Sequence, residues 1–158
     1  MTLTKKQPPA PVARKITADA LRGLPQSKIK ELFDQLGPSK TEELKHDWSF
    51  WARDNQLEPQ DADWNVWFIN AGRGFGKTRS GVEWVRENVK HGIKRIAAVA
   101  STNSDIERVM VKGESGFLSV CWKGDKTHKG KKMGFPDWSP TKRTLTWENG
   151  AQVQFFSA

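Results

Sequence analysis

A glycine-rich octapeptide is the segment of this chain whose residue types and spacing best suit chemistry. Residues 71–78 read Ala-Gly-Arg-Gly-Phe-Gly-Lys-Thr and match the phosphate-loop pattern G-x-x-x-x-G-K-[S/T], except that Ala71 replaces the first glycine. Glycines let backbone N–H groups turn toward phosphate oxygens, and a helix beginning at the loop directs its positive dipole end at the same anion. The sequence therefore predicts that this loop binds a nucleoside triphosphate, namely ATP.

Three side chains of the loop have specific expected roles. Lys77 should bridge the β- and γ-phosphates, and the Thr78 hydroxyl should ligate Mg²⁺. Arg73 can reach the γ-phosphate and stabilise transition-state charge, although a salt bridge or an outward-pointing side chain fits the sequence equally well. Arg73 and Lys77 are thus the predicted catalytic residues, and a glycine-rich surface turn is the alternative for the whole loop. The predicted nucleotide-binding residues here are Gly72, Arg73, Gly74, Phe75, Gly76, Lys77, Thr78 and Arg79.

The elements around the loop predict an α/β fold. An apolar run of strand length, residues 66–69, precedes the loop, and an amphipathic helix ending near His91 and Gly92 follows it. Residues 96–100 read as a second buried strand and residues 104–111 as a short helix. Strand, loop, helix and strand form a βαβ unit, so we expect a largely parallel sheet with both faces covered by helices.

The flanking segments have simpler patterns. Residues 1–16 contain prolines and charge and predict a flexible basic arm. Residues 26–36 carry one apolar helical stripe that Gly37-Pro38 should end, and a second helix is expected from Ser39 to Arg53. We therefore assign residues 17–63 to a helical segment and residues 64–158 to the core.

The C-terminal part of the core predicts a hairpin. Residues 144–147 and 152–156 flank Asn149-Gly150, a dipeptide typical of tight turns between paired strands. Among the eight tryptophans, those at helix or strand positions, such as Trp147, are expected to pack in the core rather than stack on bases.

The net charge of +8 is concentrated in two segments. Residues 1–30 carry seven basic side chains against one acidic, and residues 122–132, here called the lysine loop, carry five against one. Such segments favour contact with a polyanion, nucleic acid above all, and lysines contact phosphates without reading sequence. A solvated surface insertion is the alternative. The predicted DNA contacts are Lys123, Lys126, Lys129, Lys131 and Lys132.

Several other classes of site and protein are disfavoured. No apolar run is long enough for a transmembrane helix, and the N-terminal lysines are not followed by the apolar stretch of a secretory signal. Cys121 has no partner for a disulfide, which fits a reducing cytoplasm. The three histidines are scattered, so spacing predicts no zinc site. Asp105 and Glu107 read as ordinary acids at a helix start.

Beyond these local patterns, several segments together resemble the large terminase subunit of tailed bacteriophages. The resemblance covers about residues 44–158 and is carried by residues 48–53, 56–57, 64–79, 81–86, 109–116, 145–151 and 156–158. It implies a P-loop ATPase of the additional-strand class, a motor that uses ATP and Mg²⁺ to drive double-stranded DNA through a portal protein into a procapsid. The implied partners also include the small terminase subunit and other copies of the chain in a ring, in the host cytoplasm and not at a membrane.

The resemblance has two further implications, one for Gln56 and one for a nuclease domain. It places Gln56 where the family contacts adenine, and an amide there can pair with the adenine edge; a surface glutamine is the alternative. A nuclease domain usually follows the ATPase domain in this family, and none is expected within these residues.

One departure from the family pattern affects the expected activity. Hydrolysis needs an apolar strand that ends in an aspartate, which binds Mg²⁺, followed by a glutamate that polarises the attacking water. The apolar run at residues 96–100 is followed instead by Ser101 and Thr102. We therefore expect a partial ATPase core, incomplete at its C-terminal end, that binds nucleotide without efficient turnover. The alternatives are a helicase-like P-loop ATPase and a non-catalytic nucleotide- or DNA-binding assembly module.

Overall fold

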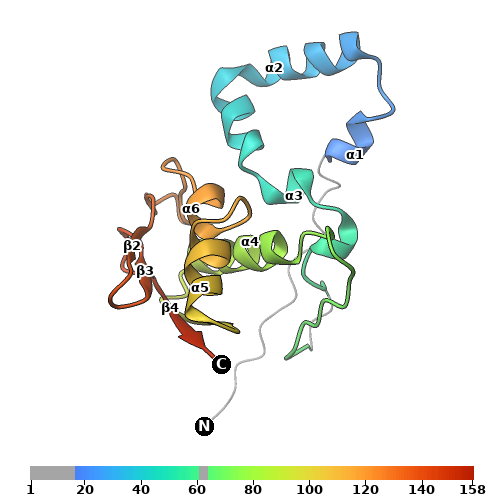
Figure 1. Ribbon diagram of the computed structural model, residues 1–158. Coiled ribbons are helices and arrows are strands. Elements are labelled where there is room, and N and C mark those ends of the chain that lie inside the picture. Colours follow the sequence, from blue (N-terminus) through green and yellow to red (C-terminus); the bar gives the residue numbers. More distant parts are fainter. Residues whose placement is uncertain (1–16, 61–63) are drawn as a thin grey trace. The chain divides into compact units, whose positions relative to one another are not determined.

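The computed structural model describes residues 17–60 and 64–158, which fall into two compact units (Figure 1). The first unit takes the described residues up to Gly72 and the second runs from Arg73 to Ala158. This division falls later than the boundary after residue 63 that the sequence suggested. The predicted basic arm, residues 1–16, lies outside the described residues. None of the described helices is long and apolar enough to cross a bilayer.

The first unit is helical, as predicted. Its elements are α1 (Ala18–Leu21), α2 (Gln26–Lys45), α3 (Trp48–Trp51) and the short 3-10 helix η1 (Asp54–Gln56). A kink at Gly37, with φ 75° and ψ 165°, divides α2 just before Pro38, which confirms the predicted interruption. The second predicted helix is shorter than expected, because α2 ends at Lys45 and Asp47 caps the separate α3 by accepting from the Ser49 N–H at 3.0 Å.

The apolar stripe of α2 faces a pocket instead of a closed core. No residue of α2 is fully buried, and a cavity of about 470 Å³ lies in this unit. The lining residues are Leu21, Leu32, Phe33, Gln35, Leu36, Leu44, Asp47 and Phe50.

The second unit is a mixed α/β structure. Its elements are α4 (Lys77–Lys90), β1 (Arg95–Ala100), α5 (Asn103–Asp105), η2 (Ile106–Val111), α6 (Phe117–Val120), β2 (Asp137–Ser139), β3 (Thr144–Thr146) and β4 (Gln152–Ser157). The helix predicted over residues 104–111 forms as α5 followed by η2, which has the wider π winding. The predicted hairpin forms as β3 and β4, paired antiparallel.

The sheet is mixed, so the prediction of a largely parallel sheet was wrong. The strand order is β1-β4-β3-β2, and only β1 and β4 are parallel. The tight turn at Asn149-Gly150 forces β3 and β4 to run in opposite directions, and β2, which sequence reasoning missed, adds antiparallel to β3.

The strand predicted at residues 66–69 does not form either. These residues pair with no strand among those that the structure describes, and the Val66 and Phe68 side chains are each 80% exposed. A strand needs a neighbour for its N–H and C=O groups, and β1 is paired only with β4. The βαβ unit is therefore reduced to its helix and second strand.

The core of the second unit lies between one face of the sheet and the helices α4, η2 and α6. Phe117 is fully buried and makes edge-on ring contacts with Trp147 and Phe155, with centroids 6.3 and 5.7 Å away. Trp147 thus packs in the core, as predicted. The other face is open, because the register partners Val99 and Phe156 are 60% and 48% exposed. The prediction that helices cover both faces of the sheet is therefore wrong for the described residues.

The core assignment predicts a contrast between two adjacent residues. Phe155→Ala should lower the free energy of unfolding by about 3–5 kcal/mol, because it removes a buried ring, whereas Phe156→Ala should cost no more than about 1 kcal/mol. Urea denaturation of both variants measures the difference, and equal losses would contradict the assignment of the inner face.

Candidate functional site

The predicted phosphate loop turns directly into the longest helix of the second unit. Gly74 has φ 80°, and Gly76, the N-cap of α4, has φ 95° and ψ 24°. Both values lie in the left-handed region that residues with a Cβ rarely adopt. The helix begins at Lys77, and its first turn closes with the Ser80 N–H donating to the Gly76 carbonyl at 2.9 Å. Two turn glycines and a helix N-terminus are therefore brought together as the sequence predicted.

The side chains predicted to bind nucleotide differ in exposure and contacts. Arg73 and Lys77 are exposed, and Thr78 is half-buried at the start of α4. Arg79 donates from Nε and Nη2 to Glu83 Oε1, at 3.0 and 2.7 Å, so Glu83 orients its guanidinium. The first turn of an α-helix carries partial positive charge, which favours an anion placed there.

Gln56, the predicted adenine contact, lies in the first unit. Its side chain is buried, and its Oε1 accepts a hydrogen bond from the Arg53 N–H at 3.1 Å in the turn of η1. The amide thus has a local structural role, and the adenine contact stays a prediction.

A buried ion network runs along α4 behind the loop. Arg86 sits between two carboxylates: its Nη1 donates to Glu83 Oε2 at 2.9 Å and its Nε to Asp125 Oδ2 at 2.7 Å, while Nη2 donates to Asp125 Oδ1. The side chains of Glu83, Arg86 and Asp125 are only 2–3% exposed. Because Glu83 also binds Arg79, the network joins the first turn of α4 to a residue in the lysine loop.

The two carboxylates keep Arg86 charged. Burial alone would lower the pKa of Arg86, but hydrogen bonds and charge from Asp125 and Glu83 outweigh it and raise the pKa above its usual value. A buried charge that loses its partner is strongly destabilising, so this pairing fixes the position of Asp125 against α4.

The lysine loop is a small ordered hairpin. Lys126 and Lys132 form a β-bridge, the Met133 N–H donates to the Asp125 carbonyl at 2.8 Å, and Met133 is fully buried. Gly130, with φ 76°, makes the turn at its tip. The loop is therefore anchored at both ends of its base, by Asp125 and by Met133, and differs in this respect from an unanchored surface insertion.

All five predicted DNA-contact lysines are exposed. Lys132 is held by Glu148, with Nζ 3.0 Å from Oε2. The exposed residues of this set are Lys123, Lys126, Lys129, Lys131 and Lys132. The hairpin thus presents a concentrated positive charge on a fixed backbone.

The two acids that follow β1 have local partners. Asp105 accepts from the Thr102 hydroxyl at 2.7 Å, while Thr102 Oγ1 accepts from the Asp105 N–H at 3.1 Å. Glu107 pairs with Lys112 at 2.5 Å. This agrees with the prediction of ordinary acids at a helix start.

Sequence reasoning missed two groups that the fold assembles. Glu83 and Arg86 are one helical turn apart, which local spacing can show, but Asp125 comes from a distant segment. In the same way Glu87 and His91 are one turn apart on α4, and His128 joins them from the lysine loop. The three could hold a metal ion, whereas the scattered spacing of the histidines predicted no such site.

Comparisons with protein-family models, with curated proteins and with solved structures each found no match. The resemblance to the large terminase subunit accordingly stays a prediction from the quoted segments.

The buried ion network predicts that replacing the Asp125 carboxylate with an amide lowers the free energy of unfolding substantially. Asp125→Asn keeps the side-chain shape but leaves Arg86 undercompensated, and it should cost about 3–5 kcal/mol of unfolding free energy. Asp137→Asn, a matched change at an exposed aspartate, should cost about 0.5 kcal/mol or less. Urea denaturation compares them, and a small effect at Asp125 would show that the network is not a structural anchor.

Proposed function

We propose that this chain binds Mg·ATP through the loop at residues 72–79 and is the ATP-binding part of a phage DNA-packaging motor. The observation that supports this best is the turn at Gly74 and Gly76, whose left-handed glycines lead directly into α4 at Lys77. Left-handed glycines allow consecutive backbone N–H groups to converge on an anion, and the helix dipole adds to that attraction.

In this proposal each side chain of the loop has a distinct role at the triphosphate. Lys77 supplies charge to the β- and γ-phosphates, and Thr78 supplies a hydroxyl to Mg²⁺. Arg73 reaches the γ-phosphate as charge develops there. Arg79, oriented by Glu83, lies in the first turn and adds positive charge near the same anion.

Double-stranded DNA is the proposed polymer partner, and the lysine loop is its contact. The loop carries exposed lysines on a hairpin anchored by Asp125 and Met133, so its charges are displayed at fixed positions. Contacts of lysine with phosphate do not read sequence, which suits a motor that must move along any DNA. A portal protein, a small terminase subunit and further copies of the chain in a ring are the implied assembly partners.

A second candidate function is a nucleotide- or DNA-binding module without catalysis. Hydrolysis of a bound triphosphate requires carboxylates near the metal and the attacking water. In the described part of the chain β1 is followed by Ser101 and Thr102, and the nearby Asp105 carboxylate accepts a hydrogen bond from the hydroxyl of Thr102, the N-cap of α5. We therefore propose tight binding with slow turnover for these residues.

Lys77→Ala tests the nucleotide site. The substitution removes the charge on the β- and γ-phosphates, so affinity for Mg·ATP should fall at least about tenfold, a loss of about 1.4 kcal/mol, with the circular dichroism spectrum unchanged. Lys28→Ala, at an exposed lysine of α2, should bind as the wild type does. Equal affinity of the two variants would refute the loop assignment.

Substitution of four lysines in the lysine loop tests the DNA contact. Removing one lysine that neutralises a phosphate should reduce the slope of log affinity against log salt by about 0.9. The variant with Lys126, Lys129, Lys131 and Lys132 changed to Ala should therefore have a slope smaller by about 3.6. Removal of the same charge from the exposed lysines Lys28, Lys30, Lys40 and Lys45 of α2 controls for net charge. If both variants change the slope equally, the loop is not a specific contact.

A further inference from the structure

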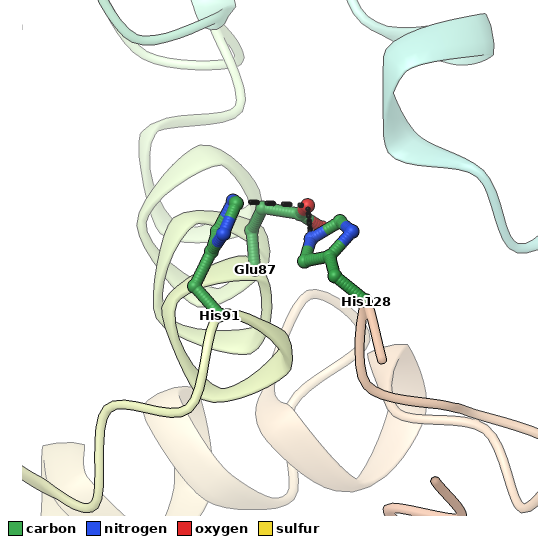
Figure 2. A group of neighbouring side chains, drawn as sticks. All are labelled: Glu87, His91 and His128. Atoms are coloured by element: carbon green, nitrogen blue, oxygen red, sulfur yellow. Dashed lines mark hydrogen bonds and ion pairs between the residues drawn. The ribbon is translucent and has the colours of Figure 1, made fainter. Parts of the chain in front are cut away.

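Three side chains from two segments meet at the C-terminal end of α4. Glu87 and His91 project from successive turns of the helix, and His128 reaches them from the lysine loop (Figure 2). Glu87 Oε1 lies 2.6 Å from His128 Nε2 and 3.7 Å from His91 Nε2. The two imidazole rings are neighbours, with centroids 4.1 Å apart. One carboxylate oxygen therefore lies close to a nitrogen of each histidine.

The backbone around this cluster is fixed on both sides. The helix ends in a Schellman motif, with Gly92 at φ 97° donating to the Val89 carbonyl at 3.0 Å and Ile93 donating to the Asn88 carbonyl at 3.0 Å. On the loop side, the His128 N–H donates to the Lys90 carbonyl at 3.1 Å. His128 is thus held against the helix end by its own main chain.

From this geometry we propose that Glu87, His91 and His128 form a binding site for a divalent transition metal, with Zn²⁺ the best fit. One ligand atom from each residue lies within 4.8 Å of the others. Ligands about 2.0–2.1 Å from a tetrahedral zinc ion are roughly 3.3 Å apart, and the two separations from Glu87 Oε1 lie on either side of that value. Two imidazoles and one carboxylate suit zinc, whereas Mg²⁺ and Ca²⁺ prefer oxygen ligands alone.

The exposure of the cluster leaves room for a fourth ligand. The side chains of Glu87, His91 and His128 are 43%, 58% and 49% exposed, so water can complete a tetrahedron. Lys90 lies 3.5 Å from the other oxygen of Glu87, Oε2, and leaves Oε1 facing the histidines. Three protein ligands and an open position are the arrangement of exchangeable zinc sites rather than closed structural ones.

The site is separate from the magnesium expected with ATP. Thr78 lies at the first turn of α4 and His91 at its C-cap, and a 14-residue helix spans roughly 20 Å at 1.5 Å per residue. The metal would join the lysine loop to the end of α4, in addition to the anchor that Arg86 and Asp125 provide. Zinc binding here does not depend on the proposed nucleotide site.

Calorimetric titration of the full chain with ZnCl₂ tests the site. We expect one zinc ion per chain, and His91→Ala and His128→Ala should each weaken binding by more than about 100-fold, since loss of even an outer partner of a metal ligand costs about 10–100-fold. His46→Ala removes the remaining histidine, which lies in the first unit, and should leave affinity unchanged. Metal-free melting curves of the variants should match that of the wild type.

Trypsin cleavage distinguishes zinc that fixes the lysine loop to α4 from zinc that binds adventitiously. Zn²⁺ should slow trypsin cleavage after Lys126, Lys129 and Lys131 in the wild type and not in His128→Ala. Cys121 is buried, which shields it from solvent and raises the pKa of its thiol to about 12, so it is disfavoured as a competing ligand. The proposal is overturned if the wild type shows no saturable zinc binding, or if His46→Ala and His128→Ala lose affinity equally.

Discussion

The pairing of Arg86 with Asp125 and Glu83 is the interaction on which the second unit depends. A guanidinium buried to this extent is stable only while both carboxylates remain in place. Glu83 belongs to the same helix, but Asp125 is 39 residues away along the chain, so the pairing closes a long segment onto α4. That segment contains β1, η2 and α6, whose apolar residues pack behind the helix.

Helix α4 connects the proposed phosphate loop, the buried ion network and the histidine cluster. Its N-terminus follows the turn at Gly76, and its middle holds the Arg86 network. At its C-terminal end Glu87 and His91 meet His128 of the lysine loop (Figure 2). Because Glu83 bonds both Arg79 and Arg86, and Arg86 bonds Asp125, a continuous chain of ion pairs runs from the first turn of α4 to the base of the lysine loop. The proposed motor would need a connection between its nucleotide site and its DNA contact, and α4 with these ion pairs would supply one.

Features that depend on residues close together in the sequence could be predicted, and features that depend on distant residues could not. The left-handed glycines, the helix from Lys77 to Lys90, the kink at Gly37 and the β3–β4 hairpin depend on neighbouring residues, and their patterns were sufficient. The apolar run at residues 66–69 has the composition of a β-strand. A strand also needs an adjacent strand to pair with, and composition does not show whether one is present. Asp125 and His128 reach α4 through tertiary folding, so no spacing rule could reveal the ion network or the histidine cluster.

Calorimetric titration of the chain with Mg·ATP decides whether the loop before α4 binds a nucleoside triphosphate. We expect saturable binding of one ATP per chain, weaker binding of AMP because the β- and γ-phosphates are missing, and little phosphate release from the same sample. If no saturable heat appears at millimolar ATP, or if AMP binds as tightly as ATP, the turn at Gly74 and Gly76 does not bind the triphosphate and the proposed nucleotide site is wrong.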